Sequence, residues 1–262
     1  MKKTFKLLII CSLILLLIPL KVFAQNNSYS WYCKRNSEHK QPDVDDPLSF
    51  ISDHGGYYVD KRAPYNGDKV IYLTFDAGYE NGNVARILDT LKEENTPAAF
   101  FVLKNIIEKE PSLIMRMVNE GHLVCNHTAN HPDVTKYATK EELLSELAKL
   151  EQVYYDLTGL EMPKYFRPPE GRFSERSMRF ANDLGYKTIF WSFAYADWDN
   201  NAQMRPDAAI NKIMDNIHNG VIMLLHPTSA TNADILGDVI RALKAEGYRF
   251  GTLDELTSEY KT

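Results

Sequence analysis

The chain has 262 residues, of which 44% are hydrophobic and 25% are charged. These proportions favour one large globular domain with a sizeable core over two small domains. The formal net charge of −5 at pH 7 argues against nucleic acid as a partner, because binding the phosphate backbone requires a positive surface.

Residues 1–24 predict a secretory signal peptide. A basic start, Lys2-Lys3, precedes an apolar run over residues 7–20, and Ala24 ends a suitable cleavage site. The run spans about fourteen residues, whereas a membrane-spanning helix needs roughly 20, which disfavours the alternative of a retained anchor. We therefore expect an exported protein without a stable membrane span. Removing four lysines from the 30 basic residues leaves 26 against 35 acidic ones, a formal charge of −9.

The next segment, residues 25–65, is polar and has scattered aromatic and turn-forming residues but no sustained period. It predicts an irregular N-terminal extension that packs on a main domain of residues 66–258. In that domain, short apolar runs predict strands at residues 70–75, 98–103, 122–125, 164–167, 188–193, 221–225 and 248–252. Helices are predicted at residues 83–94, 111–120, 140–157, 174–184, 206–219 and 232–246.

This alternation of strand and helix predicts a parallel sheet covered by helices, with ligands at the carboxyl ends of the strands. The first strand–helix turn lacks the glycine fingerprint that cradles phosphate in nucleotide-binding open sheets. We therefore expect a distorted (β/α) barrel with seven or eight parallel strands, the alternative being an open doubly wound sheet.

Polar residues follow the ends of the first and third predicted strands. Asp76 closes the first strand, where a turn or helix-capping role is the structural alternative. His127 and His131, four residues apart, follow the third strand at a spacing suited to a divalent metal, although surface helices produce this spacing by chance.

Later strands end in the same manner. Arg167 stands before two prolines that stiffen its loop and could clamp a carboxylate, or it could be a solvated surface residue. Asp197 and Trp198 follow the next strand, and Trp198 is a candidate wall of a sugar or acyl pocket. His226 closes an apolar strand, as either a buried imidazole or a titrating one. A barrel would gather all these side chains on one face.

Five ordered motifs between about residues 69 and 256 resemble the polysaccharide deacetylases of carbohydrate esterase family four, which contain the NodB homology domain. They are Thr74-Phe75-Asp76, His127-Thr128-Ala129-Asn130-His131, Arg167-Pro168-Pro169, Asp197-Trp198 and Leu224-Leu225-His226-Pro227. Residues 31–36, 74–80 and 166–174 are similar to the delta-lactam-biosynthetic branch. That branch removes the N-acetyl group from N-acetylmuramic acid in peptidoglycan, a step towards the muramic delta-lactam of the spore cortex. Peptidoglycan glycan strands are therefore the expected partner, and we expect the enzyme to be a monomer.

The resemblance implies a role for each matched residue. His127 and His131 would bind a divalent metal, most often zinc, and Asp76 would be the base that activates water at the metal. His226 would protonate the departing amine. The remaining site residues would orient or contact these groups and the substrate: Arg167 orienting Asp76, Asp197 holding His226, Leu224 with Trp198 enclosing the acetyl methyl, and Arg172 and Tyr79 contacting the sugar.

The chain departs from the wider family at two positions. Ala77 stands where a second aspartate usually binds the metal, so we hypothesise that Asp76 also contacts the metal or that water completes a weak site. Glu80 is a less favoured substitute. Ala194 stands where the wider family often has an acid.

Other functions remain open from the sequence. A glycosidase would use Asp76 and Asp197 as paired carboxylates, and a non-catalytic module would bind glycan without cleaving acetate. Within the deacetylases, polymers of N-acetylglucosamine and acetylated xylan are alternative substrates. Beyond the signal peptide the chain has two cysteines. Cys125, in an apolar strand, predicts a buried free thiol, but the sequence does not decide whether it pairs with Cys33.

Overall fold

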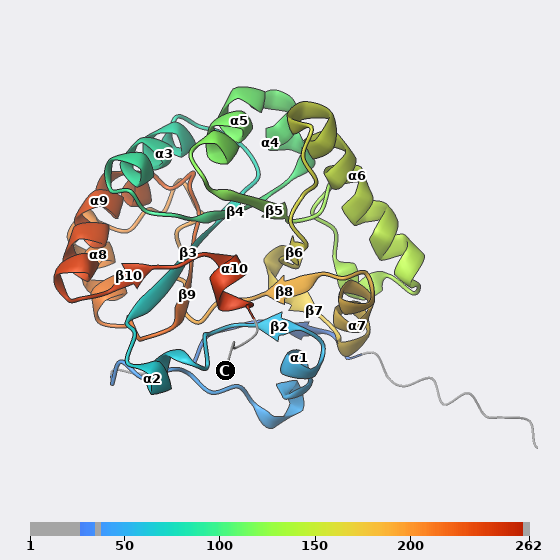
Figure 1. Ribbon diagram of the computed structural model, residues 1–262, viewed down its shortest axis with the longest axis horizontal. Helices are drawn as coiled ribbons and strands as arrows, with labels where there is room; N and C mark the ends of the chain where they lie inside the picture. The colour runs from blue at the N-terminus through green and yellow to red at the C-terminus, as the bar shows by residue number, and fades with distance from the viewer. Residues whose placement is uncertain (1–26, 35–37, 259–262) are drawn as a thin grey trace, which may run out of the picture.

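The computed structural model of the chain describes residues 27–34 and 38–258, and the predicted signal peptide lies outside them. Its centre is an eight-stranded sheet in which every strand pair is parallel and which curls into a barrel (Figure 1). The strands are β2 (Gly56–Tyr57), β3 (Val70–Ala77), β4 (Ala99–Val102), β5 (Leu123–Asn126), β6 (Tyr165–Phe166), β8 (Lys187–Ile189), β9 (Val221–Leu225) and β10 (Arg249–Phe250). The predicted distorted (β/α) barrel is confirmed.

Helices surround the sheet on its outer side (Figure 1). They are α3 (Asn83–Glu93), α4 (Lys104–Lys109), α5 (Pro111–Asn119), α6 (Lys140–Thr158), α7 (Glu175–Asp183), α8 (Pro206–Met214) and α9 (Ala230–Ala245). The expected capping box of Thr139 and Glu142 begins α6. In contrast, α8 ends five residues before its predicted end at residue 219, because Asn219 bonds the backbone of Val70 and Ala63 instead of continuing a helix. Within the described ranges, no helix has both the length and the apolar character needed to cross a membrane.

Alternation along the strands separates two cores. In β3, Ile71, Leu73 and Phe75 pack outward against the helices, whereas Val70 and Tyr72 pack inside the barrel. The interior cluster also includes Ala99, Phe101, Cys125, Tyr165, Ile189 and Ile222. Cys125 is a buried free thiol, as predicted, and forms no disulfide with Cys33.

The barrel closes between β8 and β9 in two different ways. At the amino end, β2 of the N-terminal extension pairs with β8, and Val59 forms a bridge with Val221. Towards the carboxyl end, β8 stops at Ile189, short of the predicted end at residue 193. There Phe193 bridges directly to Met223 of β9. The extension, which also contains β1 (Tyr29–Ser30), α1 (Phe50–Asp53) and α2 (Ala63–Asn66), therefore fills a gap in the sheet.

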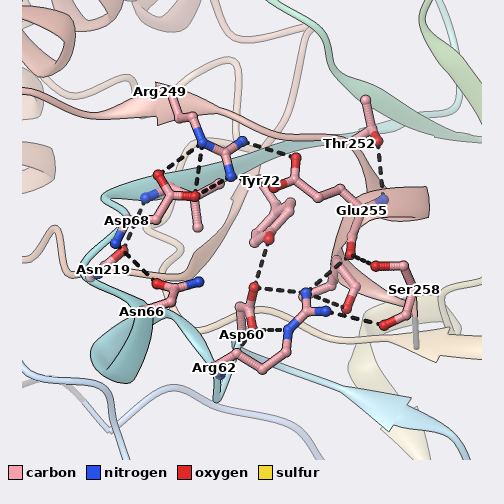
Figure 2. A network of polar contacts seen from close by, with 12 residues as sticks. Asp60, Arg62, Asn66, Asp68, Tyr72, Asn219, Arg249, Thr252, Glu255 and Ser258 are labelled. Carbon is pink, nitrogen blue, oxygen red and sulfur yellow. Dashed lines mark hydrogen bonds and ion pairs between the residues drawn. The ribbon is translucent and has the colours of Figure 1, made fainter. Parts of the chain in front are cut away.

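A polar network covers the amino end of the barrel (Figure 2). Asp60 is 4% exposed and accepts hydrogen bonds from Tyr72 Oη at 2.7 Å and Arg62 Nε at 2.8 Å. Arg62 also donates to the carbonyls of Glu255 and Leu256 in α10 (Leu253–Leu256). One buried carboxylate thus connects the extension, β3 and the C-terminal helix.

Replacing Asp60 by asparagine should destabilise the fold by about 1.5–3 kcal/mol at pH 7, since hydrogen bonds to charged groups have that value. Burial raises the pKa of Asp60, but Arg62 and Tyr72 together hold it below the ordinary value of 3.8. The stability difference between wild type and variant should therefore persist above pH 3.8 and shrink below it. Urea unfolding between pH 7 and 3 measures this.

Asp68→Asn provides the matched control, because Asp68 pairs with Arg249 in a partly exposed position and such pairs contribute about 0–1 kcal/mol. Equal destabilisation by the two substitutions would contradict the importance assigned to Asp60.

Candidate active site

The carboxyl ends of four strands place polar side chains in, or directly behind, one cavity at that end of the barrel. Side chains two residues apart on a strand share a face. Each of these polar residues follows by two an inward-facing residue: Asp76 follows Thr74, His127 follows Cys125, Arg167 follows Tyr165 and His226 follows Leu224. The cavity has a volume of about 600 Å³ and is lined by Trp31, Asp76, His127, His131, Glu170, Gly171, Trp191, Ala194, Tyr195, Trp198, Leu224 and His226.

Arg167 is fully buried behind this cavity and binds Asp76. Its Nη1 donates to Asp76 Oδ1 at 2.8 Å, its Nη2 to Thr74 Oγ1 at 2.9 Å and its Nε to the carbonyl of Ile189 at 2.9 Å. Burial raises the pKa of Asp76, but the charge of Arg167, assisted by two histidines, outweighs it and holds this pKa below the ordinary value. Asp76 is therefore an ionised carboxylate facing the cavity.

His127 faces the same carboxylate from the other side. Its Nδ1 lies 2.8 Å from the carbonyl of Arg167, which can only accept, so Nδ1 carries the proton and Nε2 has a free lone pair. Burial lowers the pKa of His127 to about 4, and the ring is neutral at pH 7. Nε2 lies 3.6 Å from Asp76 Oδ2, too far for a hydrogen bond.

These two facing acceptors fit a divalent cation. Their 3.6 Å separation is one that two ligands of a single ion, each about 2.1 Å from it, can have. The ring of His131 lies 5.1 Å from that of His127 between centroids and lines the cavity. Even so, residues 27–34 and 38–258 contain no group of three or more His, Cys, Asp or Glu placed to hold a metal. Ala77 is buried and offers no donor.

The loop that carries the two histidines is strained. Thr128 and His131 have φ of 75° and 57°, values that cost about 1–3 kcal/mol each for such residues. Hydrogen bonds hold the loop in this shape: His131 N donates to Thr128 Oγ1, and Asn130 N donates to the buried Glu146. The two imidazoles therefore meet through a left-handed turn and not through helical spacing.

His226 and Asp197 form a second charged pair across the cavity. Asp197 is 1% exposed and accepts from His226 Nδ1 at 2.7 Å, from His226 N at 2.8 Å and from Asn232 Nδ2 at 2.6 Å. Burial lowers the pKa of His226, but the hydrogen bond and charge of Asp197 raise it more, and the result lies above the ordinary value. Trp198 is largely exposed, and its ring forms an edge-to-face pair with that of His226.

The other two predicted substrate contacts lie outside the cavity lining. Arg172 pairs with Asp133 at 3.1 Å and with Glu170 at 3.3 Å, and the latter carboxylate does line the cavity. Tyr79 accepts a hydrogen bond from Asn200 Nδ2 at 2.7 Å.

Sequence reasoning missed several cavity residues. One of them is Trp191, which the inward position of Ile189 two residues earlier would have placed beside Arg167. Trp31 comes from the extension, and nothing in its local sequence signals this position.

Sequence and structure comparisons show which known proteins this chain is similar to. A family model described as polysaccharide deacetylase matches residues 63–189. The chain is 39% identical over 235 residues to the peptidoglycan-N-acetylmuramic acid deacetylase PdaA of Bacillus subtilis, covering 89% of this chain and 88% of that protein. The solved structure of B. subtilis PdaA, a family 4 carbohydrate esterase, matches with a TM-score of 0.83 and 39% identity over 88% of this chain and 97% of that chain.

Two further relatives differ in their described activities. A peptidoglycan-N-acetylglucosamine deacetylase of Bacillus cereus is 34% identical over 214 residues, covering 80% of this chain and 74% of that protein. BA3943 of Bacillus anthracis, described as a CE4 family pseudoenzyme, matches with a TM-score of 0.68 and 27% identity over 79% of this chain and 70% of that chain.

Replacing Asp197 by asparagine should lower the pKa of His226, because the variant keeps the burial that lowers it and loses the carboxylate that raises it. NMR titration of the imidazole nitrogens measures this change. A pKa of His226 that stays unchanged or rises would contradict this electrostatic account.

Proposed function

Because the chain belongs to the polysaccharide deacetylase family, carbohydrate esterase family 4, we propose that it hydrolyses the N-acetyl group of N-acetylmuramic acid in peptidoglycan. The enzyme class follows from the family. The observation that carries the mechanism is the cavity that holds Asp76 ionised and a histidine, His226, with a raised pKa. A base and an acid held in opposite protonation states are what amide hydrolysis requires.

In this mechanism Asp76 accepts a proton from the water that attacks the acetyl carbonyl. His226 donates its proton to the nitrogen as the carbon–nitrogen bond breaks, so that acetate and a free amino sugar leave. Arg167 keeps Asp76 ionised and oriented, and Asp197 keeps the proton on His226. Leu224 and Trp198 line the cavity beside His226 and would contact the acetyl methyl.

The family is generally metal-dependent, and zinc is the metal we propose. His127, His131 and Asp76 would hold it, where it would polarise the acetyl carbonyl as a Lewis acid. The neutral state of His127 and the orientation of its Nε2 towards Asp76 support this assignment. With Ala77 in place of an acid, the site would have one carboxylate fewer than the wider family pattern, which favours weaker metal binding.

Muramic acid is proposed as the substrate on two grounds: the identity with PdaA over most of both chains and the ion pair of Arg172 with Glu170, a residue that lines the cavity. Arg172 would bind the lactyl carboxylate. The product would then lead to the muramic delta-lactam of spore cortex. Residues 1–24 would export the protein to the cell wall.

Two alternatives have specific support. The negatively charged Glu170 lines the cavity and would suit the uncharged N-acetylglucosamine, on which the B. cereus relative acts according to its name. The absence of an acid at Ala77 would suit a non-catalytic glycan-binding module, and the B. anthracis relative is described as a pseudoenzyme. Against the second alternative, Asp76, His127 and His226 line one cavity in this chain.

Mass spectrometry of cell-wall glycan strands, with and without stem peptides, tests the proposed reaction. Incubation with the zinc-supplemented protein should remove acetyl groups from muramic acid. Asp76→Asn should lower the rate by about 10²–10⁴-fold, as expected for loss of a general base. Acetyl loss from glucosamine alone would replace the substrate, and no loss from either sugar would favour the binding module.

The same variant tests the metal site by calorimetry without any turnover. Asp76→Asn should bind zinc more weakly than wild type, because it loses an anionic ligand. Equal affinity would remove Asp76 from the ligand set and leave its role as a base untouched.

Arg172→Gln tests the sugar preference. The substitution should raise KM for strands with free lactyl carboxylates roughly 10-fold, the effect of one lost charged hydrogen bond, and should leave KM for N-acetylglucosamine oligomers unchanged. Arg205→Gln, at an exposed arginine paired with Asp207, is the control. Equal changes on both substrates would contradict recognition of the carboxylate by Arg172.

A further inference from the structure

Trp31 reaches the active-site cavity from the N-terminal extension. The two residues before it form β1, which pairs antiparallel with β7 (Arg172–Phe173). Its own backbone N donates to the carbonyl of Gly171 at 2.8 Å. This pairing places the indole, 7% exposed, in the wall of the cavity.

The indole is attached to the segment that follows β8. Trp31 Nε1 donates to the carbonyl of Trp191 at 2.8 Å. Its ring lies 4.8 Å from that of Phe190, between centroids, with the two planes tilted by 31°. Both contacts fall on residues 190–191. Phe190 is fully buried, and the hydrogen bond to Trp191 is partly buried.

This same segment holds the buried guanidinium that binds the catalytic carboxylate. Arg167 Nε donates to the carbonyl of Ile189 at 2.9 Å, and its Nη2 lies 3.3 Å from the carbonyl of Phe190. The guanidinium also lies 5.6 Å from the ring of Trp191. A continuous set of contacts therefore runs from Trp31 through residues 189–191 to Arg167 and on to Asp76.

A second connection runs through the loop that follows Arg167. Gly171 has φ of +63°, and a Cβ at this position would lie 2.8 Å from the Trp191 ring and 3.1 Å from Trp31 Cβ. The loop therefore contacts both tryptophans closely at Gly171, a position where only glycine fits. Movement of the Trp31 indole would release the loop and the carbonyl-bearing segment together.

We propose that Trp31 is a positioning residue: by fixing the carbonyls of residues 189–190 and the loop at Gly171, it fixes Arg167 and so the orientation of Asp76. The extension is thereby part of the catalytic unit. The expected effect of Trp31 on kcat depends on the proposed deacetylase function, whereas its expected effect on the position of Arg167 does not.

Hydrogen exchange at Arg167 Nε separates these consequences, because it requires no turnover. In wild type this N–H is buried and bonded to Ile189, so its NMR signal should exchange slowly. Trp31→Ala should accelerate its exchange at least tenfold and lower kcat on glycan strands about 10–100-fold, the scale of a misplaced catalytic group. Trp31→Phe, which keeps a ring beside Phe190 but loses the bond to Trp191, should accelerate exchange less and retain more of kcat.

Leu48→Ala is the matched control. Leu48 is as buried as Trp31 and belongs to the same hydrophobic cluster but does not line the cavity. It should lower Tm while leaving the exchange rate and kcat unchanged. If neither Trp31 variant accelerates exchange, or if Leu48→Ala accelerates it equally, the positioning role is overturned. Faster exchange in a protein whose wild type releases no acetate would instead retain that role and remove the proposed deacetylase function.

Discussion

The ion pair between Arg167 and Asp76 is the interaction on which the site depends. The guanidinium has no exposure to solvent, and a buried charge of this kind is costly unless it is paired and hydrogen-bonded. Its partners are the carboxylate, the Thr74 hydroxyl, two backbone carbonyls and the face of Phe101, 4.2 Å away. The arginine thus fills the upper barrel where a hydrophobic layer would otherwise lie, and it keeps Asp76 charged. One contact therefore both satisfies the buried guanidinium and sets the charge of the carboxylate in the cavity.

The two halves of the cavity are electrostatically opposite because their histidines have different partners. The imidazole of His127 donates to a neutral carbonyl and stays uncharged, while that of His226 donates to a buried carboxylate and favours its proton. An imidazole therefore presents a lone pair on one side of the cavity and a proton on the other. This difference in charge arises from the group that accepts the hydrogen bond of each Nδ1, on the side of the ring away from the cavity.

Much of this arrangement could be predicted from the order of residues along the strands. Asp76, Arg167 and His226 follow apolar runs directly, and a parallel barrel gathers such positions at one end. The deacetylase family was also predicted from five local motifs. Sequence reasoning failed where distant segments meet. The insertion of β2 between β8 and β9, and the entry of Trp31 into the cavity, depend on pairings over more than 100 residues that no local period records. The left-handed turn at Thr128 was likewise hidden, because its cost is offset by bonds to Asn126 and, through Asn130, to Glu146 in α6.

The closure of the barrel by β2 also bears on where the folding unit begins. The deacetylase family model starts at residue 63, yet β2 and Val59, which bridge β8 and β9 at the amino end, lie before it. A chain that began at the family boundary would expose the edges of two strands, each offering unpaired backbone groups to a neighbouring molecule. It would also lack Asp60 beneath Tyr72. We therefore expect the smallest soluble fragment to be longer than the segment that carries the motifs, with its start upstream of β1.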